Sequence, residues 1–155
     1  IPNLVREGLG PQGTALLSIT VHAEACSDLQ QVVTQVKESG AKVGVALSPS
    51  TPLDALDEVL SDLDMVLIMT VHPGFPAQAF IEDAVGKVVR LRAMLDERGL
   101  PTELEVDGGI NVTTAPRVVS AGATVLVAGS AVFNQHKSIA ESVTLIRESV
   151  ANVRN

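Results

Sequence analysis

The sequence predicts an α/β fold in which parallel strands alternate with helices. Short runs rich in Val, Ile and Leu alternate with longer segments in which apolar residues recur every three or four positions. Hydrophobic residues make up 46% of the chain but aromatic residues only 2%, so the core must be aliphatic, which suits a buried parallel sheet. Unusual polar residues and glycines follow the strand-like runs, and α/β folds bind ligands at that edge of the sheet.

Five runs have the composition and length of strands. The segments that separate them leave room for one helix each, as the connection between two parallel strands requires. The runs cover residues 16–22, 42–48, 65–71, 103–107 and 124–129. We therefore expect five strands in one parallel sheet.

Helical periodicity fills the segments that follow the strands. We predict helices at residues 27–40, 51–63, 81–99, 113–122 and 137–153.

Local signals mark the ends of the first two predicted helices. Ser27 and Thr51 are the expected N-caps, and Pro52 suits the first helical position. The acidic run at residues 54–64 is the expected solvated face of the second helix. Residues 2–9 have the pattern of the end of an earlier helix.

Length and charge narrow the class of protein. A chain of 155 residues suits one domain, residues 1–155, and a net charge of −7 argues against a nucleic-acid partner. No apolar run approaches the roughly 20 residues that span a bilayer, and no export signal is visible, so we expect a cytoplasmic protein without a membrane partner. The single cysteine, Cys26, agrees with a reducing compartment. Because the sequence opens at Ile1 without an initiator methionine, we expect part of a longer protein.

The stretch ELEVDGGIN, residues 103–111, combines a strand with an acid and two glycines. Asp107 at the strand end could transfer a proton, or it could turn the chain through a side-chain hydrogen bond to the backbone. Gly108 and Gly109 allow a phosphate to approach backbone N–H groups, since they carry no Cβ. Gly129 and Ser130 follow the next strand, so the two loops could hold one anion or be unrelated tight turns.

Three motifs in order, IMTVHPGF, LEVDGGIN and VAGSAVF, resemble those of the ribulose-phosphate 3-epimerase family. That family has the TIM or (β/α)8-barrel fold of the ribulose-phosphate-binding type. The resemblance runs over nearly the whole chain and implies that its five strands are strands four to eight of the barrel. The first three strands, with the family's other catalytic aspartate and its metal-binding histidines, have no match here.

The resemblance implies a reaction and a role for Asp107. Members interconvert D-ribulose 5-phosphate and D-xylulose 5-phosphate by removing and returning the proton at C3 through an enediolate. Asp107 matches a residue that transfers this proton and also binds one divalent metal ion, which could be Zn, Fe, Mn or Co. Because the other ligands have no match, we expect the metal site to be incomplete in this chain.

The resemblance also implies contacts with the rest of the substrate. Gly74, Phe75, Pro76 and Ala77 match a loop over the phosphate that usually reads PGFGGQ. Proline at position 76 removes an N–H group and stiffens the loop, which puts phosphate contacts at the two substituted positions in doubt. Met69 resembles a methionine that lines the sugar pocket, although a methionine in a buried strand is more often part of the core.

Three histidines raise the question of a zinc site. The spacing of His22, His72 and His136 fits no zinc pattern, since such a site needs three or four ligands in fixed geometry. His22 resembles a family histidine outside the first metal shell, and we expect His136 to be a solvated surface residue.

Three functions stay open at the level of sequence. The leading hypothesis is a sugar-phosphate 3-epimerase with a small sugar phosphate as its partner. The alternatives are a non-catalytic phosphate-binding partial barrel and an aldolase or synthase acting on a hexulose phosphate. Five strands of a barrel would leave two open edges and an apolar inner face, so we also expect a homo-oligomer unless a missing segment covers them.

Overall fold

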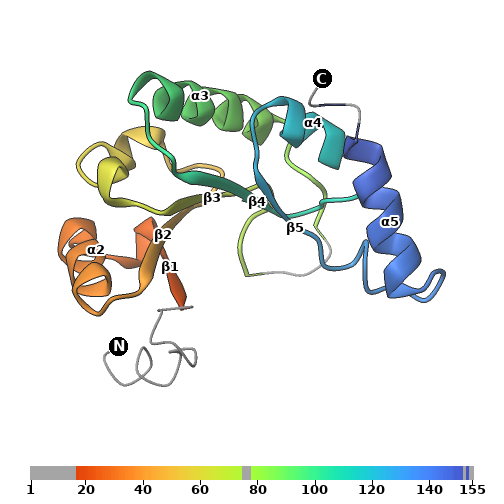
Figure 1. The fold of residues 1–155 in the computed structure, drawn as a ribbon, viewed down its shortest axis with the longest axis horizontal. Coiled ribbons are helices and arrows are strands. Elements are labelled where there is room, and N and C mark those ends of the chain that lie inside the picture. Colours follow the sequence, from red (N-terminus) through yellow and green to blue (C-terminus); the bar gives the residue numbers. More distant parts are fainter. Residues whose placement is uncertain (1–16, 75–77, 152, 154–155) are drawn as a thin grey trace.

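The computed structural model describes residues 17–74, 78–151 and 153. Its centre is a five-stranded parallel sheet in which the strands lie side by side in sequence order (Figure 1). The strands are β1 (Ser18–His22), β2 (Lys42–Leu47), β3 (Met65–Met69), β4 (Glu103–Asp107) and β5 (Val125–Val127). All five predicted strands are therefore confirmed, in a single parallel sheet.

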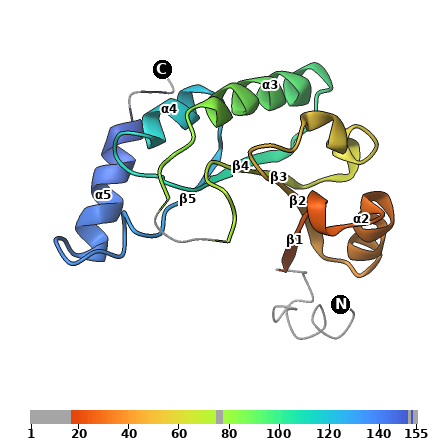
Figure 2. The same cartoon turned by 180° about the vertical axis from the view of Figure 1, so that it is seen from behind.

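Four α-helices of the described chain lie along one side of this sheet, as the views from front and back both show (Figures 1 and 2). Parallel strands in sequence order with helices on one side are the arrangement of a (β/α) barrel wall. The helices are α2 (Leu29–Glu38), α3 (Asp83–Glu97), α4 (Ala115–Ser120) and α5 (Ile139–Val150), and a short 3₁₀ helix, η1 (Ala23–Ala25), follows β1. The helical tail predicted at residues 2–9 lies outside the described residues. Within the described chain, no helix is both long and apolar enough to cross a bilayer.

The N-cap of α2 differs from the predicted one. The side chain of Asp28, not Ser27, accepts a hydrogen bond from the backbone N–H of Gln31, with 2.9 Å between the atoms. The helix therefore begins one residue later than expected, at a residue type that caps equally well.

The α-helix predicted at residues 51–63 is wrong. The chain instead forms two 3₁₀ helices, η2 (Leu53–Leu56) and η3 (Leu60–Asp62), joined by turns with hydrogen bonds between residues three apart. The leucines of this segment and Val59 are buried, and the acidic side chains of η2 and η3 are exposed. The predicted solvated face is therefore correct although the helix type is not.

Two distant side chains bind Thr51, the residue at which this α-helix was expected to begin. The carbonyl of Thr51, which could accept the first helical hydrogen bond, accepts one from Nζ of Lys87 in α3 instead, with 2.6 Å between the atoms. The hydroxyl of Thr51, the expected N-cap group, donates to the carboxylate of Glu24. In the described chain neither group makes a hydrogen bond within a helix, so the local N-cap signal at Thr51 is not used.

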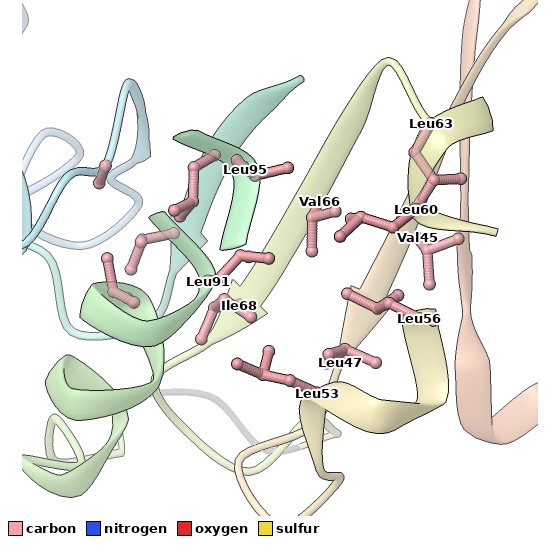
Figure 3. Packing of buried hydrophobic residues seen from close by; sticks show 14 of the residues in the cluster. Val45, Leu47, Leu53, Leu56, Leu60, Leu63, Val66, Ile68, Leu91 and Leu95 are labelled. Carbon is pink, nitrogen blue, oxygen red and sulfur yellow. The ribbon is translucent and has the colours of Figure 1, made fainter. Parts of the chain in front are cut away.

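The core fills the space between the sheet and its helices (Figure 3). Val66 and Ile68 of β3 point towards Leu91 and Leu95 of α3, and all four are fully buried. Leu56 of η2 packs into the same cluster. Burying each such aliphatic side chain contributes roughly 1.5–3 kcal/mol, so an aliphatic core of this kind can hold the helices against the sheet without large rings.

The opposite face of β4 is acidic. Leu104 and Val106 are buried against the helices, so Glu103, Glu105 and Asp107 point to the other side of the sheet. The expected apolar inner face is therefore wrong for this strand, because alternation places three acids there in succession. The segments after the strands all lie at the same edge of the sheet, since the strands are parallel.

Candidate functional site

A cavity of about 260 Å³ lies at the carboxyl ends of β3, β4 and β5. It brings together seven of the predicted site residues from three separate segments of the chain: Met69, Gly74, Asp107, Gly108, Gly109, Gly129 and Ser130. The other three predicted contacts, Phe75, Pro76 and Ala77, lie outside the described residues.

Several lining residues were not predicted from the sequence. They are Val71, His72, Pro73, Gln78, Ile110 and Val127. Each lies close in sequence to a predicted residue, so the motifs already contained the signal. The carbonyl of His72 accepts a hydrogen bond from Nε2 of Gln78 at 2.5 Å, which links two of these lining residues.

Asp107 is the last residue of β4 and its half-buried side chain faces the cavity. Burial raises the pKa of this carboxyl group above its ordinary value. In the described part of the chain, no hydrogen bond or ion pair engages the carboxylate. A carboxylate of raised pKa without a competing partner is suited to accept a proton from a bound molecule.

The hydrogen bond that turns the chain after β4 comes from Asn111, not from Asp107. The Asn111 side-chain oxygen accepts hydrogen bonds from the N–H groups of Thr113 and Thr114, at 2.8 and 3.1 Å. The hydroxyl of Thr114 donates to the carbonyl of Gly109 at 2.8 Å. The turning role considered for Asp107 is therefore performed elsewhere, and its carboxylate stays available to the cavity.

Gly108 and Gly109 are required by the loop itself. Their φ angles are +126° and +65°, in the region that residues with a Cβ rarely adopt. A Cβ on Gly108 would lie 2.6 Å from Cγ2 of Val71, and one on Gly109 would lie 3.0 Å from Cβ of Phe80. The two glycines thus let this loop pack directly against the segment that follows β3.

Thr70 holds the same loop from behind the cavity. Its side chain is fully buried, and its hydroxyl lies 3.1 Å from the carbonyl oxygen of Asp107 and 2.5 Å from that of Gly108. Its backbone N–H also donates to the carbonyl of Asp107 at 2.8 Å. Sequence reasoning missed this residue, although its place directly after β3 at the carboxyl edge was a signal.

Replacing Thr70 with Val should destabilise the protein by about 1–3 kcal/mol, because the isosteric side chain leaves a buried carbonyl without its donor. Replacement with Ser keeps the hydroxyl and should cost less. Urea unfolding of the two variants checks this difference. A larger loss for Thr70→Ser than for Thr70→Val would show that packing of the methyl group, not the hydroxyl, makes Thr70 important.

Backbone N–H groups are candidate anion donors at the cavity. The N–H groups of Gly129 and Ser130 donate to no acceptor among the described residues, and both residues line the cavity beside Gly109. The loops after β4 and β5 therefore border one cavity and are not unrelated turns. Convergent N–H groups without a side chain in the way can bind a phosphate.

A larger hollow of about 670 Å³ lies between the start of α2 and the 3₁₀ helix η2 with the turn that follows it. Four acids line it, namely Asp28, Asp54, Asp57 and Glu58, so it would repel an anionic ligand. The smaller cavity beside Asp107 is therefore the better candidate for a phosphorylated molecule.

The described residues do not complete a metal site. No group of three His, Cys, Asp or Glu side chains within them could hold a metal ion. Among the described residues that line the cavity, Asp107 is the only carboxylate. His22 lies away from this cavity, with Nδ1 at 3.4 Å from a carboxylate oxygen of Glu24, and His136 is exposed as predicted.

Comparison with known proteins gives the same assignment as the motifs. A family model described as "Ribulose-phosphate 3 epimerase family" matches residues 11–133. The ribulose-phosphate 3-epimerase of Bacillus subtilis (strain 168) is 50% identical over 118 residues, which are 76% of this chain and 54% of the relative. That of Synechocystis is 43% identical over 148 residues, which are 96% of this chain and 64% of the relative. The chain thus spans between about half and two thirds of the length of these relatives.

The fold has a relative among solved structures. The 3-hexulose-6-phosphate synthase from Salmonella typhimurium matches with a TM-score of 0.62 at 20% identity, over 88% of this chain and 63% of that chain. At this identity the likeness concerns the fold alone, and it agrees with a partial (β/α)8 barrel. The three ordered motifs and the family match over most of the sequence lead to one assignment: the chain belongs to the ribulose-phosphate 3-epimerase family.

Proposed function

We propose that the protein is a sugar-phosphate 3-epimerase that interconverts D-ribulose 5-phosphate and D-xylulose 5-phosphate. One observation carries the proposal: a carboxylate of raised pKa and the backbone amides of two glycine loops line the same cavity. The names of the curated relatives support this choice of reaction over aldol chemistry on a hexulose phosphate. Formation of xylulose 5-phosphate from added ribulose 5-phosphate tests it directly.

In this proposal Asp107 removes the proton from C3 of the bound ketose. The electron pair of the broken C–H bond enters the enediolate that forms across C2 and C3, and the carboxylate becomes a carboxylic acid. Inversion then requires a proton donor on the opposite face of the enediolate. Among the described residues, Asp107 is the one carboxylate that lines the cavity. The proposal therefore places the second proton donor outside the described residues.

Binding of a divalent metal ion remains a prediction from the family resemblance. Asp107 could contribute one oxygen ligand, but the described residues do not provide the remaining ligands. When bound, such an ion would act as a Lewis acid that stabilises the enediolate oxygens.

For the phosphate end, Gly129→Val should weaken binding of ribulose 5-phosphate by at least about tenfold, whereas Ser130→Ala should change it by less than about twofold. An added Cβ at Gly129 has no protein atom within 4 Å, so the valine side chain would enter the space where an anion approaches the amides. Losing the N–H contacts to a charged group costs roughly 1.5–3 kcal/mol. Calorimetric titration of both variants checks the ranking, and the reverse order would contradict binding through the backbone.

A further inference from the structure

Lys87 is a buried cation whose partners are backbone carbonyls. Lys87 is only 5% exposed and lies in α3 among the residues that pack on the sheet. Nζ donates hydrogen bonds to the carbonyl oxygens of Ser48, Pro49 and Thr51, at 2.9, 2.7 and 2.6 Å. All three protons of the ammonium group are therefore engaged by one short loop.

No carboxylate of the described chain forms an ion pair with Lys87. Burial lowers the pKa of the ammonium group, with a further contribution from the charge of Arg90, while Glu24 acts in the opposite direction. Lys37 of α2 shows the ordinary alternative, since its exposed side chain pairs with Asp62 at 2.5 Å. Carbonyl dipoles thus replace a counter-ion at Lys87.

The same loop is held from its other side by an anion. The Glu24 carboxylate accepts hydrogen bonds from the backbone N–H of Ser48, at 2.8 Å, and from the hydroxyl of Thr51. Burial raises the pKa of Glu24, but these hydrogen bonds outweigh burial and lower the pKa to about 2. The loop at residues 48–51 therefore presents its carbonyls to a cation and its donors to a carboxylate.

We propose that the carbonyls of Ser48, Pro49 and Thr51 form a site for a monovalent cation, which the protein fills with the ammonium group of Lys87. Three carbonyl oxygens that converge on one point, with no carboxylate among the hydrogen-bond partners of the cation, are the environment in which proteins bind potassium-sized cations. The internal cation fixes the loop after β2. None of these residues lines the cavity beside Asp107, so the inference is independent of the proposed function.

The test is the Lys87→Met variant of the full chain, which keeps most of the aliphatic stem but removes the ammonium group. We expect the folding equilibrium constant to fall by roughly a hundredfold, because buried carbonyls lose a charged donor. Potassium or ammonium chloride should restore much of this loss as ions occupy the vacated position, whereas tetramethylammonium chloride at equal ionic strength should not. Lys37→Met is the matched control and should show little loss and no ion-specific recovery.

Two results would overturn the proposal: wild-type stability in Lys87→Met, or equal recovery in all three salts, which would indicate general screening. If the variant does not fold in any salt, NMR of the wild-type protein provides the test, through the rate at which the lysine ammonium protons exchange with water. The ammonium protons of Lys87 should exchange slowly with water, and those of Lys37 rapidly. Equally rapid exchange at both lysines would refute the cation site.

Discussion

Replacing Asp107 with Asn should slow exchange of the C3 proton of a pentulose 5-phosphate with solvent deuterium by at least about a hundredfold. The amide has nearly the same shape but cannot accept the proton, and positioned general bases contribute roughly 10²–10⁴-fold. Loss of the C3 proton signal of D-ribulose 5-phosphate and of D-xylulose 5-phosphate, followed by NMR in deuterium oxide, measures this exchange. Equal exchange with both proteins would remove Asp107 from the mechanism.

Comparing the two substrates also distinguishes exchange of the C3 proton from inversion at C3. A single base on one face can remove the proton and return a deuteron to the same face, so it labels one epimer without converting it. Two groups on opposite faces convert each epimer into the other. If deuterium enters only one epimer, the chain has one working base. If the two epimers interconvert, it has both acid/base groups.

Glu105→Gln is the matched control for this experiment. Glu105 lies two residues before Asp107 on the same face of β4, but it does not line the cavity. Removal of this carboxylate should leave the exchange rate nearly unchanged. A comparable loss in both variants would indicate a general effect of charge on this face of the sheet.

The pH dependence should follow the raised pKa of Asp107. The carboxylate is the active form, so the exchange rate should rise with pH, with its midpoint above the pKa of about 3.9 of an ordinary aspartate. Because burial raises this pKa, the charged carboxylate is less stable in the folded protein than in the unfolded chain, and it opposes folding once the pH exceeds the pKa of an ordinary aspartate. Asp107→Asn should therefore remain folded at neutral pH, and thermal unfolding checks this.

Gly108→Ala should destabilise the protein by about 3 kcal/mol or more. A left-handed residue with a Cβ costs roughly 1–2 kcal/mol, and overpacking adds about 1–3 kcal/mol. Both apply here, because φ is +126° and the new Cβ would lie 2.8 Å from the backbone nitrogen of Val71. Urea unfolding of the variant measures the loss.

Two other glycines separate these contributions. Gly40 has a φ of +82° but no atom within 4 Å of an added Cβ, so Gly40→Ala should show only the conformational cost. Gly129 has neither a positive φ nor a close neighbour, so Gly129→Ala should change stability by less than about 0.5 kcal/mol. A loss for Gly108→Ala no greater than that for Gly40→Ala would contradict the contact with Val71.

The sequence alone determined the five strands, their parallel arrangement and the edge at which the site forms. Apolar alternation in β4 also specified that Asp107 turns away from the helices. These features depend on the periodicity of apolar residues within short segments, which can be recognised without knowledge of the rest of the chain.

Only the tertiary structure decided what happens at residues 51–63 and around Asp107. Thr51 and Pro52 are sound local helix signals, but the chain forms 3₁₀ helices there, and the carbonyl of Thr51 binds Lys87, 36 residues further along. Thr70 supports the loop of Asp107 from 37 residues away. Neither contact has a local pattern, because each arises when neighbouring units of a parallel sheet bring distant side chains against exposed backbone groups.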